Sequence, residues 1–83
     1  MNNIKPPSLE SEGKFIKNRV LTKREREVFV LLVQNKTTRD IAGLLGISEK
    51  TVRNHISNVM QKLGVKGRAA AVVELLKLNE ITL

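Results

Sequence analysis

Apolar residues recur every third or fourth position along most of the chain, and this spacing places them on one face of an α-helix. Short polar or glycine-containing breaks divide the pattern into segments, which predict helices over residues 23–34, 38–45, 49–63 and 68–78. No segment alternates apolar and polar residues as a half-buried strand does. The pattern therefore predicts an all-α fold of four helices joined by short turns within residues 21–83.

The ends of the predicted helices carry residues that suit helix termini. Thr22 and Glu25 have the spacing of a capping box, in which each side chain accepts a hydrogen bond from the other residue's backbone N–H. Thr37 and Asp40 repeat this spacing at the start of the second helix. Gly46 follows the second helix, where glycine permits the positive φ that a tight turn needs. These signals support the boundaries that the apolar pattern predicts.

Residues 1–20 have no helical period. Two adjacent prolines and Gly13 are typical of an extended or turning chain, so we expect a flexible N-terminal arm. Apolar residues near its end, such as Phe15 and Ile16, would be able to pack against the helical domain. The arm lacks the apolar core of a signal peptide, and the chain has no run of about 18 apolar residues. We therefore expect a soluble cytoplasmic protein with one small domain and no membrane segment.

The segment 49–63 has two chemically different faces. With Val52 set at zero on a helical wheel, Ile56, Val59 and Leu63 lie within about 40° of it and form one apolar stripe. The opposite side carries polar side chains rich in hydrogen-bond donors, and none of them is acidic. These candidates for contact with bases are Lys50, Arg53, Asn54, Ser57 and Asn58. A merely solvated helix usually mixes Glu with Lys for i,i+4 pairs, so this composition indicates a binding face.

The order of the second and third predicted helices is that of a helix–turn–helix. A short helix, a turn containing glycine and a longer helix follow one another, and in this arrangement the longer helix enters the DNA major groove. Arg53 suits guanine, because its guanidinium can bond O6 and N7 together, and Asn54 suits the N6 and N7 of adenine. We therefore expect the helix over 49–63 to read bases.

The starts of the second and third predicted helices indicate contacts with DNA phosphates. Unpaired N–H groups and the positive end of the helix dipole attract anions there. Nearby hydroxyls and lysines add donors and charge, and the candidates are Lys36, Thr37, Thr38, Ser48, Thr51 and Lys66. For Thr37 and Ser48 the alternative is that the hydroxyl only caps its helix.

The chain is strongly basic, with 15 Lys and Arg against 8 Asp and Glu and a formal net charge of +7. The excess is concentrated in residues 48–68, which contain five Lys or Arg and one Glu. Such a distribution is typical of a surface that binds polyanions. The alternative is a basic surface that binds nothing.

Several kinds of chemical site find no support in the sequence. The chain has no cysteine, which excludes disulfides and Cys-ligated zinc. His55 is the only histidine and has no partner at ligand spacing, so we expect no metal site. We also expect no cofactor and no small-molecule ligand. Paired carboxylates and a GxxxxGK phosphate loop are also missing, so we do not expect an enzyme. We expect His55 to be half-buried, with one ring nitrogen hydrogen-bonded or in contact with a phosphate.

The segment 68–78 is more apolar than one core-facing stripe requires. The surplus predicts a second buried face, and a symmetric pair of these helices in a homodimer is the simplest way to cover it. The predicted dimer contacts are Ala71, Val72, Leu75 and Leu78. The alternative is a helix that is buried on both sides within one chain.

Short motifs spread over residues 21–80 complete the pattern. They are Leu21-Thr-x-Arg-Glu25, Ile41-Ala42, Leu45-x-Ile47-Ser48, Thr51-Val52-x-x-His55, Lys62-Leu63-x-Val65 and Arg68. Together they resemble the LuxR/FixJ-type helix–turn–helix family. This resemblance implies a DNA-binding domain that dimerises through its last helix and binds a two-fold-related site in double-stranded DNA. It also implies that Arg53, Asn54 and Ser57 face the bases.

Within this family, the stretches TKREREVF, ISEKTVRNHISN and MQKLGVKGR are most similar to members that stand alone, without a receiver or ligand-sensing domain, and regulate late sporulation genes. That similarity implies a transcription regulator that activates some promoters and represses others. It also implies action beside RNA polymerase, in the mother cell of a sporulating bacterium.

Two other functions stay open at this point. Gly64-Val-Lys-Gly67 resembles the GxxG loop of RNA-binding KH domains, but that reading requires neighbouring strands, and the chain is poor in aromatic residues for stacking on bases. A protein–protein adaptor on the same helical fold would use the segment 68–78 for docking. The non-acidic face of the segment 49–63 argues against an adaptor.

Overall fold

The computed structural model describes residues 20–83 and consists there of four helices, α1 (Lys23–Val33), α2 (Thr38–Leu45), α3 (Glu49–Leu63) and α4 (Arg68–Lys77). No strand occurs within this described range. The predicted all-α fold is confirmed, and each helix boundary agrees with its prediction to within one residue. The expected flexible arm, with the docking of Phe15 and Ile16, lies outside the described residues.

The predicted helix caps are present. Thr22 Oγ1 accepts a hydrogen bond from the N–H of Glu25, and the Glu25 carboxylate accepts one from the N–H of Thr22. Thr37 and Asp40 make the same reciprocal pair at the start of α2. After α1 the chain turns at Asn35, which has a φ of 67°. Local sequence therefore determines where these helices begin and end.

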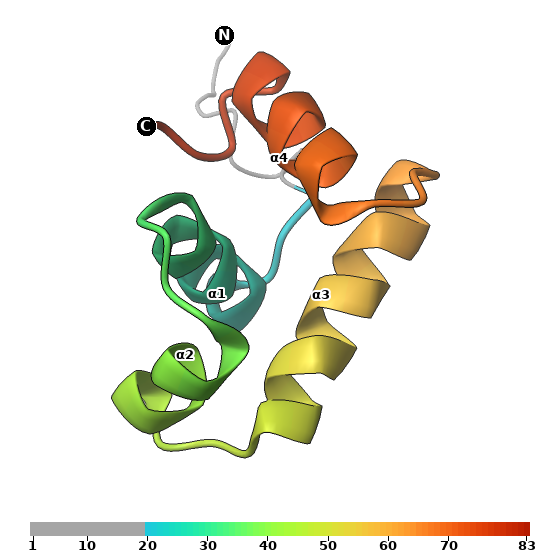
Figure 1. Cartoon of the computed structure of the whole chain (residues 1–83). Helices are drawn as coiled ribbons and strands as arrows, with labels where there is room; N and C mark the ends of the chain where they lie inside the picture. The colour runs from blue at the N-terminus through green and yellow to red at the C-terminus, as the bar shows by residue number, and fades with distance from the viewer. Residues whose placement is uncertain (1–19) are drawn as a thin grey trace, which may run out of the picture.

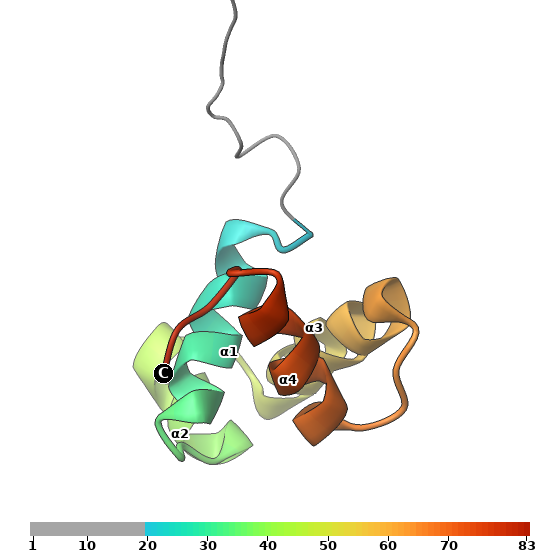
Figure 2. The same ribbon diagram turned by 90° about the horizontal axis from the view of Figure 1, so that it is seen from above.

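The helices are arranged around α3, the longest of them (Figure 1). The α2–α3 turn lies at the N-terminal end of α3, and α4 lies near its C-terminal end. The view from above shows α1 between α2 and α4, packed on the inner side of α3 (Figure 2). One side of α3 is left without a covering helix.

The core takes residues from all four helices. The largest fully buried side chains are Val28, Phe29, Ile41, Val52, Val59 and Leu75. On α1, Val28 and Phe29 are fully buried, whereas Leu31 and Leu32 are only half-buried. On α2, Ile41 is buried but Leu44 is 62% exposed, so the second apolar position of this helix faces outward.

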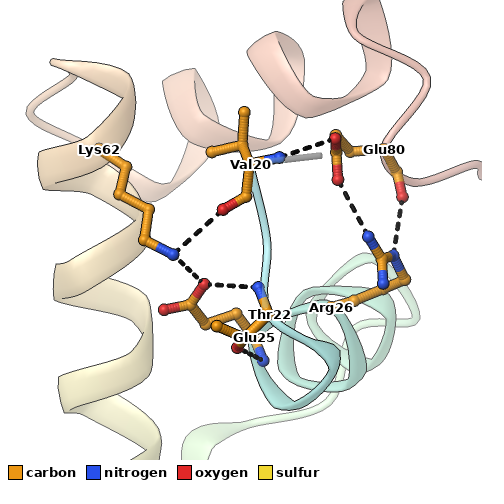
Figure 3. A network of polar contacts seen from close by, with 6 residues as sticks. All are labelled: Val20, Thr22, Glu25, Arg26, Lys62 and Glu80. Carbon is orange, nitrogen blue, oxygen red and sulfur yellow. Dashed lines mark hydrogen bonds and ion pairs between the residues drawn. The ribbon is translucent and has the colours of Figure 1, made fainter. Parts of the chain in front are cut away.

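Polar contacts tie the two ends of the described chain to α1 and α3 (Figure 3). The buried carboxylate of Glu25 pairs with Lys62 of α3, and Lys62 also donates to the carbonyl of Val20 at 3.1 Å. The Glu80 carboxylate accepts from the N–H of Val20 at 3.0 Å and from Arg26 at 3.1 Å. Val20 thus has both of its backbone polar groups bonded by side chains from distant parts of the sequence.

The ionisation of Glu25 reflects two opposed effects. Burial raises the pKa of this carboxyl, but hydrogen bonds from Lys62 and Thr22, together with the charge of Lys62, outweigh burial and leave the pKa below its ordinary value of 4.5. Glu25 is therefore a charged residue in the core at neutral pH, compensated by its partners.

Candidate nucleic-acid interface

The connection between α2 and α3 is only three residues long, Gly46, Ile47 and Ser48. Gly46 has a φ of 69°, which glycine adopts without steric cost, and the N–H of Ile47 bonds back to the carbonyl of Ala42 at 3.0 Å. Ser48 then caps α3 by accepting from the N–H of Thr51. These contacts fix α2 and α3 as a helix–turn–helix.

The two faces of α3 separate as the sequence pattern predicts. Val52, Ile56 and Val59 are at most 2% exposed and hold the helix to the core. The candidates for base contact all lie on the opposite, exposed side, and they are Lys50, Arg53, Asn54, Ser57 and Asn58. The structure therefore brings these side chains to one accessible face, while their contact with bases stays a prediction.

An acidic residue lies beside this face, and the search for hydrogen-bond donors in the sequence did not select it. Glu49, in the first turn of α3, accepts a hydrogen bond from Nη1 of Arg53 at 3.2 Å. The signal was present in the sequence, since the two residues have the i,i+4 spacing at which Glu and Arg pair on a helix. The free protein thus holds the guanidinium of Arg53 beside a carboxylate.

The candidates for phosphate contact lie at three places. Lys36, Thr37 and Thr38 lie at the start of α2, and Ser48 and Thr51 lie at the start of α3. Lys66 lies beyond the other end of α3, and this helix is about 22 Å long at 1.5 Å per residue. The structure therefore does not bring Lys66 together with the other five residues.

Three hydroxyls at these helix starts, those of Thr37, Ser48 and Thr51, have hydrogen-bond partners within the protein. Thr37 accepts from the N–H of Asp40 at 3.0 Å, and Ser48 Oγ lies 2.9 Å from Thr51 Oγ1. The backbone and side-chain hydrogen bonds from Thr37 lower the pKa of Asp40. Capping is thus confirmed for Thr37 and Ser48, and contact with a phosphate would be an additional role for these exposed groups.

His55 is half-buried, as expected, at the edge of the buried stripe of α3. Within residues 20–83 no cluster of three or more side chains is arranged to hold a metal ion.

The prediction for the dimer contacts requires a correction. Ala71 and Leu75 have no exposed surface and belong to the core of the subunit, so they cannot meet a partner chain. The large apolar side chains that α4 and its C-cap leave exposed are Val73, at 50%, and Leu78, at 49%, and Val72 is half-buried. An outward apolar surface therefore exists, but two of its four predicted members do not lie on it.

A helix–turn–helix with a basic, donor-rich outer face defines a class of DNA-binding regulators, and comparison with known families agrees. Residues 19–75 match the family described as bacterial regulatory proteins, luxR family. The chain belongs to this family and is a DNA-binding transcription regulator.

Among its relatives, the chain is 69% identical over 72 residues to the spore germination protein GerE of Bacillus subtilis (strain 168), covering 87% of this chain and 97% of that protein. A solved structure of the transcription factor GerE superimposes with a TM-score of 0.76 at 60% identity, covering 78% of this chain and 97% of that one.

A longer relative matches the chain over a part of its own length. The transcriptional regulatory protein DegU of Brevibacillus brevis is 50% identical over 58 residues, which are 70% of this chain but 25% of that protein. None of the helices that the structure describes has the length and hydropathy of a membrane-crossing segment.

Proposed function

We propose that the chain is a sequence-specific regulator of late sporulation genes that binds DNA as a dimer and reads the major groove with α3. The observation that carries this proposal is the division of α3 into a fully buried apolar stripe and an exposed face of non-acidic polar side chains. Membership of the luxR family supports it independently.

In this proposal the outer face of α3 supplies the base contacts. Arg53 and Asn54 lie in its first two turns, the part of a recognition helix that reaches base edges in helix–turn–helix proteins. Lys50, Ser57 and Asn58 extend the same face. Each good bidentate pair would contribute about 1–3 kcal/mol of discrimination between bases.

The helix starts then fix the domain on the DNA backbone. First-turn N–H groups of α2 and α3 point toward the phosphates on either side of the groove, and Lys36, Thr38 and Thr51 add donors beside them. Lys66, beyond the far end of α3, would contact a different phosphate. Such contacts orient the domain and carry no sequence information of their own.

Dimerisation would proceed through the outward side of α4. Val73 and the half-buried Val72 offer apolar surface there, Leu78 is exposed at the C-cap, and a symmetric pair of helices would cover them. Two copies related by a two-fold axis would present two α3 helices to half-sites about 34 Å apart, one turn of DNA. The expected partner is thus double-stranded DNA with a two-fold-related site.

The sporulation role rests on similarity to GerE of Bacillus subtilis, which is called a spore germination protein. By this similarity the chain would act in the cytoplasm of the mother cell, beside RNA polymerase, as an activator at some promoters and a repressor at others. A deletion strain should sporulate with altered transcript levels of late genes, and unchanged transcripts would contradict this part of the proposal.

Selection of bound duplexes from a random DNA pool tests the DNA proposal most directly. The expected result is one enriched motif with two inverted half-sites. Enrichment of no motif would contradict sequence-specific binding, and a single half-site without its inverted repeat would contradict the dimer. The same selection with single-stranded RNA tests the KH-like alternative, against which the absence of strands in residues 20–83 argues.

A further inference from the structure

Glu49 is the only acidic residue of α3 and lies beside the donor face, where a negative charge would repel DNA phosphates. It pairs with Arg53 one turn further on, although the Glu49 side chain is 41% exposed and that of Arg53 is 54% exposed. Ion pairs this exposed add little to stability. The ion pair alone is therefore a weak reason for an acid at this position of a DNA-binding helix, where a first-turn carboxylate also interacts favourably with the helix dipole.

The geometry of the pair leaves Arg53 able to bind a base. The carboxylate engages Nη1, whereas a guanidinium has five N–H donors in one plane, and among residues 20–83 no partner binds the donors on Nε and Nη2. On the helical wheel Glu49 lies about 40° from Arg53, on the side away from the middle of the donor face. The carboxylate thus supports the guanidinium from the flank.

We infer that Glu49 is a specificity-determining residue that acts by positioning Arg53 for bidentate contact with a base. This inference rests on the proposed function and adds to it a residue that itself contacts no base. Holding the guanidinium in one orientation before binding reduces the side-chain entropy that is lost when the base contact forms.

The same carboxylate disfavours the competing use of Arg53. A free arginine would bind phosphates of any sequence, and phosphate contacts supply most of non-specific affinity. Glu49 occupies part of the guanidinium and repels phosphate oxygens, so binding to unrelated sequences weakens. Both effects increase the ratio of specific to non-specific affinity.

Glu49→Gln tests the inference, because it removes the charge and keeps the size of the side chain. Dissociation constants would be measured by fluorescence anisotropy for three duplexes: the selected site, the same site with the base pair read by Arg53 replaced, and a random sequence. Discrimination at that base pair should fall about two- to ten-fold, since immobilising one rotamer-rich side chain on binding corresponds to this ratio. Affinity for the random duplex should rise.

Two comparisons separate positioning from a simple change of net charge. In an Arg53→Ala background, Glu49→Gln should change discrimination no further, because the residue it positions is gone. Glu27→Gln is the matched control: it removes a carboxylate from a similarly exposed pair with Arg24, at 3.0 Å, on α1. It should leave discrimination unchanged. Circular dichroism of each variant should match that of the wild-type protein.

Two results would overturn the inference while leaving the proposed function intact. One is unchanged discrimination in Glu49→Gln, and the other is an equal loss with and without Arg53. A wild-type protein that prefers no sequence would overturn the proposed function itself, and the inference with it.

Discussion

Arg53 and Asn54 are the side chains whose loss should change which sequences are bound. Arg53→Ala and Asn54→Ala should each reduce preference for one base pair by about 1–3 kcal/mol, because each removes a two-donor or donor–acceptor contact to a base edge. Binding to a panel of single-substitution duplexes measures this. Arg24→Ala, which removes an exposed positive charge on α1, is the control and should leave the preference intact. Equal weakening on every duplex would show that α3 does not face the bases.

Glu25 is the residue at which stability should respond to pH. Glu25→Gln should lower the free energy of unfolding by about 1–3 kcal/mol at pH 7, because it weakens charge-assisted hydrogen bonds to a buried group. Glu74→Gln is the control, since its pair with Lys77 spans 3.9 Å at the surface, and should cost under about 0.5 kcal/mol.

The direction of the pH effect follows from the lowered pKa of Glu25. A carboxyl whose folded pKa lies below its unfolded value stabilises the fold fully above the unfolded value of 4.5 and loses this contribution as the pH falls toward the folded pKa. The stability difference between wild type and Glu25→Gln should therefore be largest at neutral pH and shrink below pH 4.5. Urea unfolding at several pH values measures it. A difference that grows on acidification would contradict the assignment.

For single residues, the sequence predicted which side chains are exposed better than it predicted which side chains pair with each other. The helical period correctly places Val52, Ile56 and Arg53 on their faces, because a rigid helix converts spacing into direction. Glu25 could be recognised as a capping residue from its distance to Thr22. Its pairing with Lys62, 37 residues away, could not, since a contact between helices depends on how they cross.

Among the elements, the α2–α3 turn depends most on one conformation. Gly46→Ala should destabilise the fold by about 1–2 kcal/mol, because φ is 69° there while no atom lies close enough to obstruct a Cβ. Gly43→Ala is the matched control, a helical glycine with equally open surroundings, and should stabilise by about 0.5–1 kcal/mol. Thermal unfolding measures both. Equal effects of the two substitutions would show that backbone conformation is not the cause.

The outward side of α4 should control association. Val73→Glu should produce monomers in sedimentation experiments, because a charge would be buried in the apolar contact between two helices. Leu44→Glu is the control, an exposed apolar position on α2, and should stay dimeric. A fully dimeric Val73→Glu would place the interface on another element. Leu75 is unsuited to this test, since it is fully buried and its substitution would unfold the subunit.

Helix boundaries were predictable because caps and breakers act within a few residues, as at Thr37 and Gly46. The sequence did not allow us to predict which side of α4 faces inward and which faces outward. Nearly every position of that helix is apolar, so periodicity could not tell the core contacts Ala71 and Leu75 from the exposed Val73.

For the whole molecule, the excess of 15 basic over 8 acidic residues should appear as a salt dependence of binding. Between about 50 and 200 mM salt, affinity of the dimer for DNA should fall about 10³-fold, as counterions displaced from phosphates become harder to release. Titrations at four salt concentrations give the slope. The random duplex is the comparison, and a flat response on both duplexes would contradict binding through phosphates.

The bonds at Val20 have a mechanical consequence. Its N–H is held by the residue that follows the last helical turn, and its carbonyl by Lys62 near the end of α3 (Figure 3). Force applied to the chain ahead of this point would load the bonds to Glu80 and Lys62 together with the backbone that leads through the buried Leu21 into α1. Val20 is thus a fixed point of the chain, and a tether attached in front of it would pull on α1, on α3 and on the segment after α4 together.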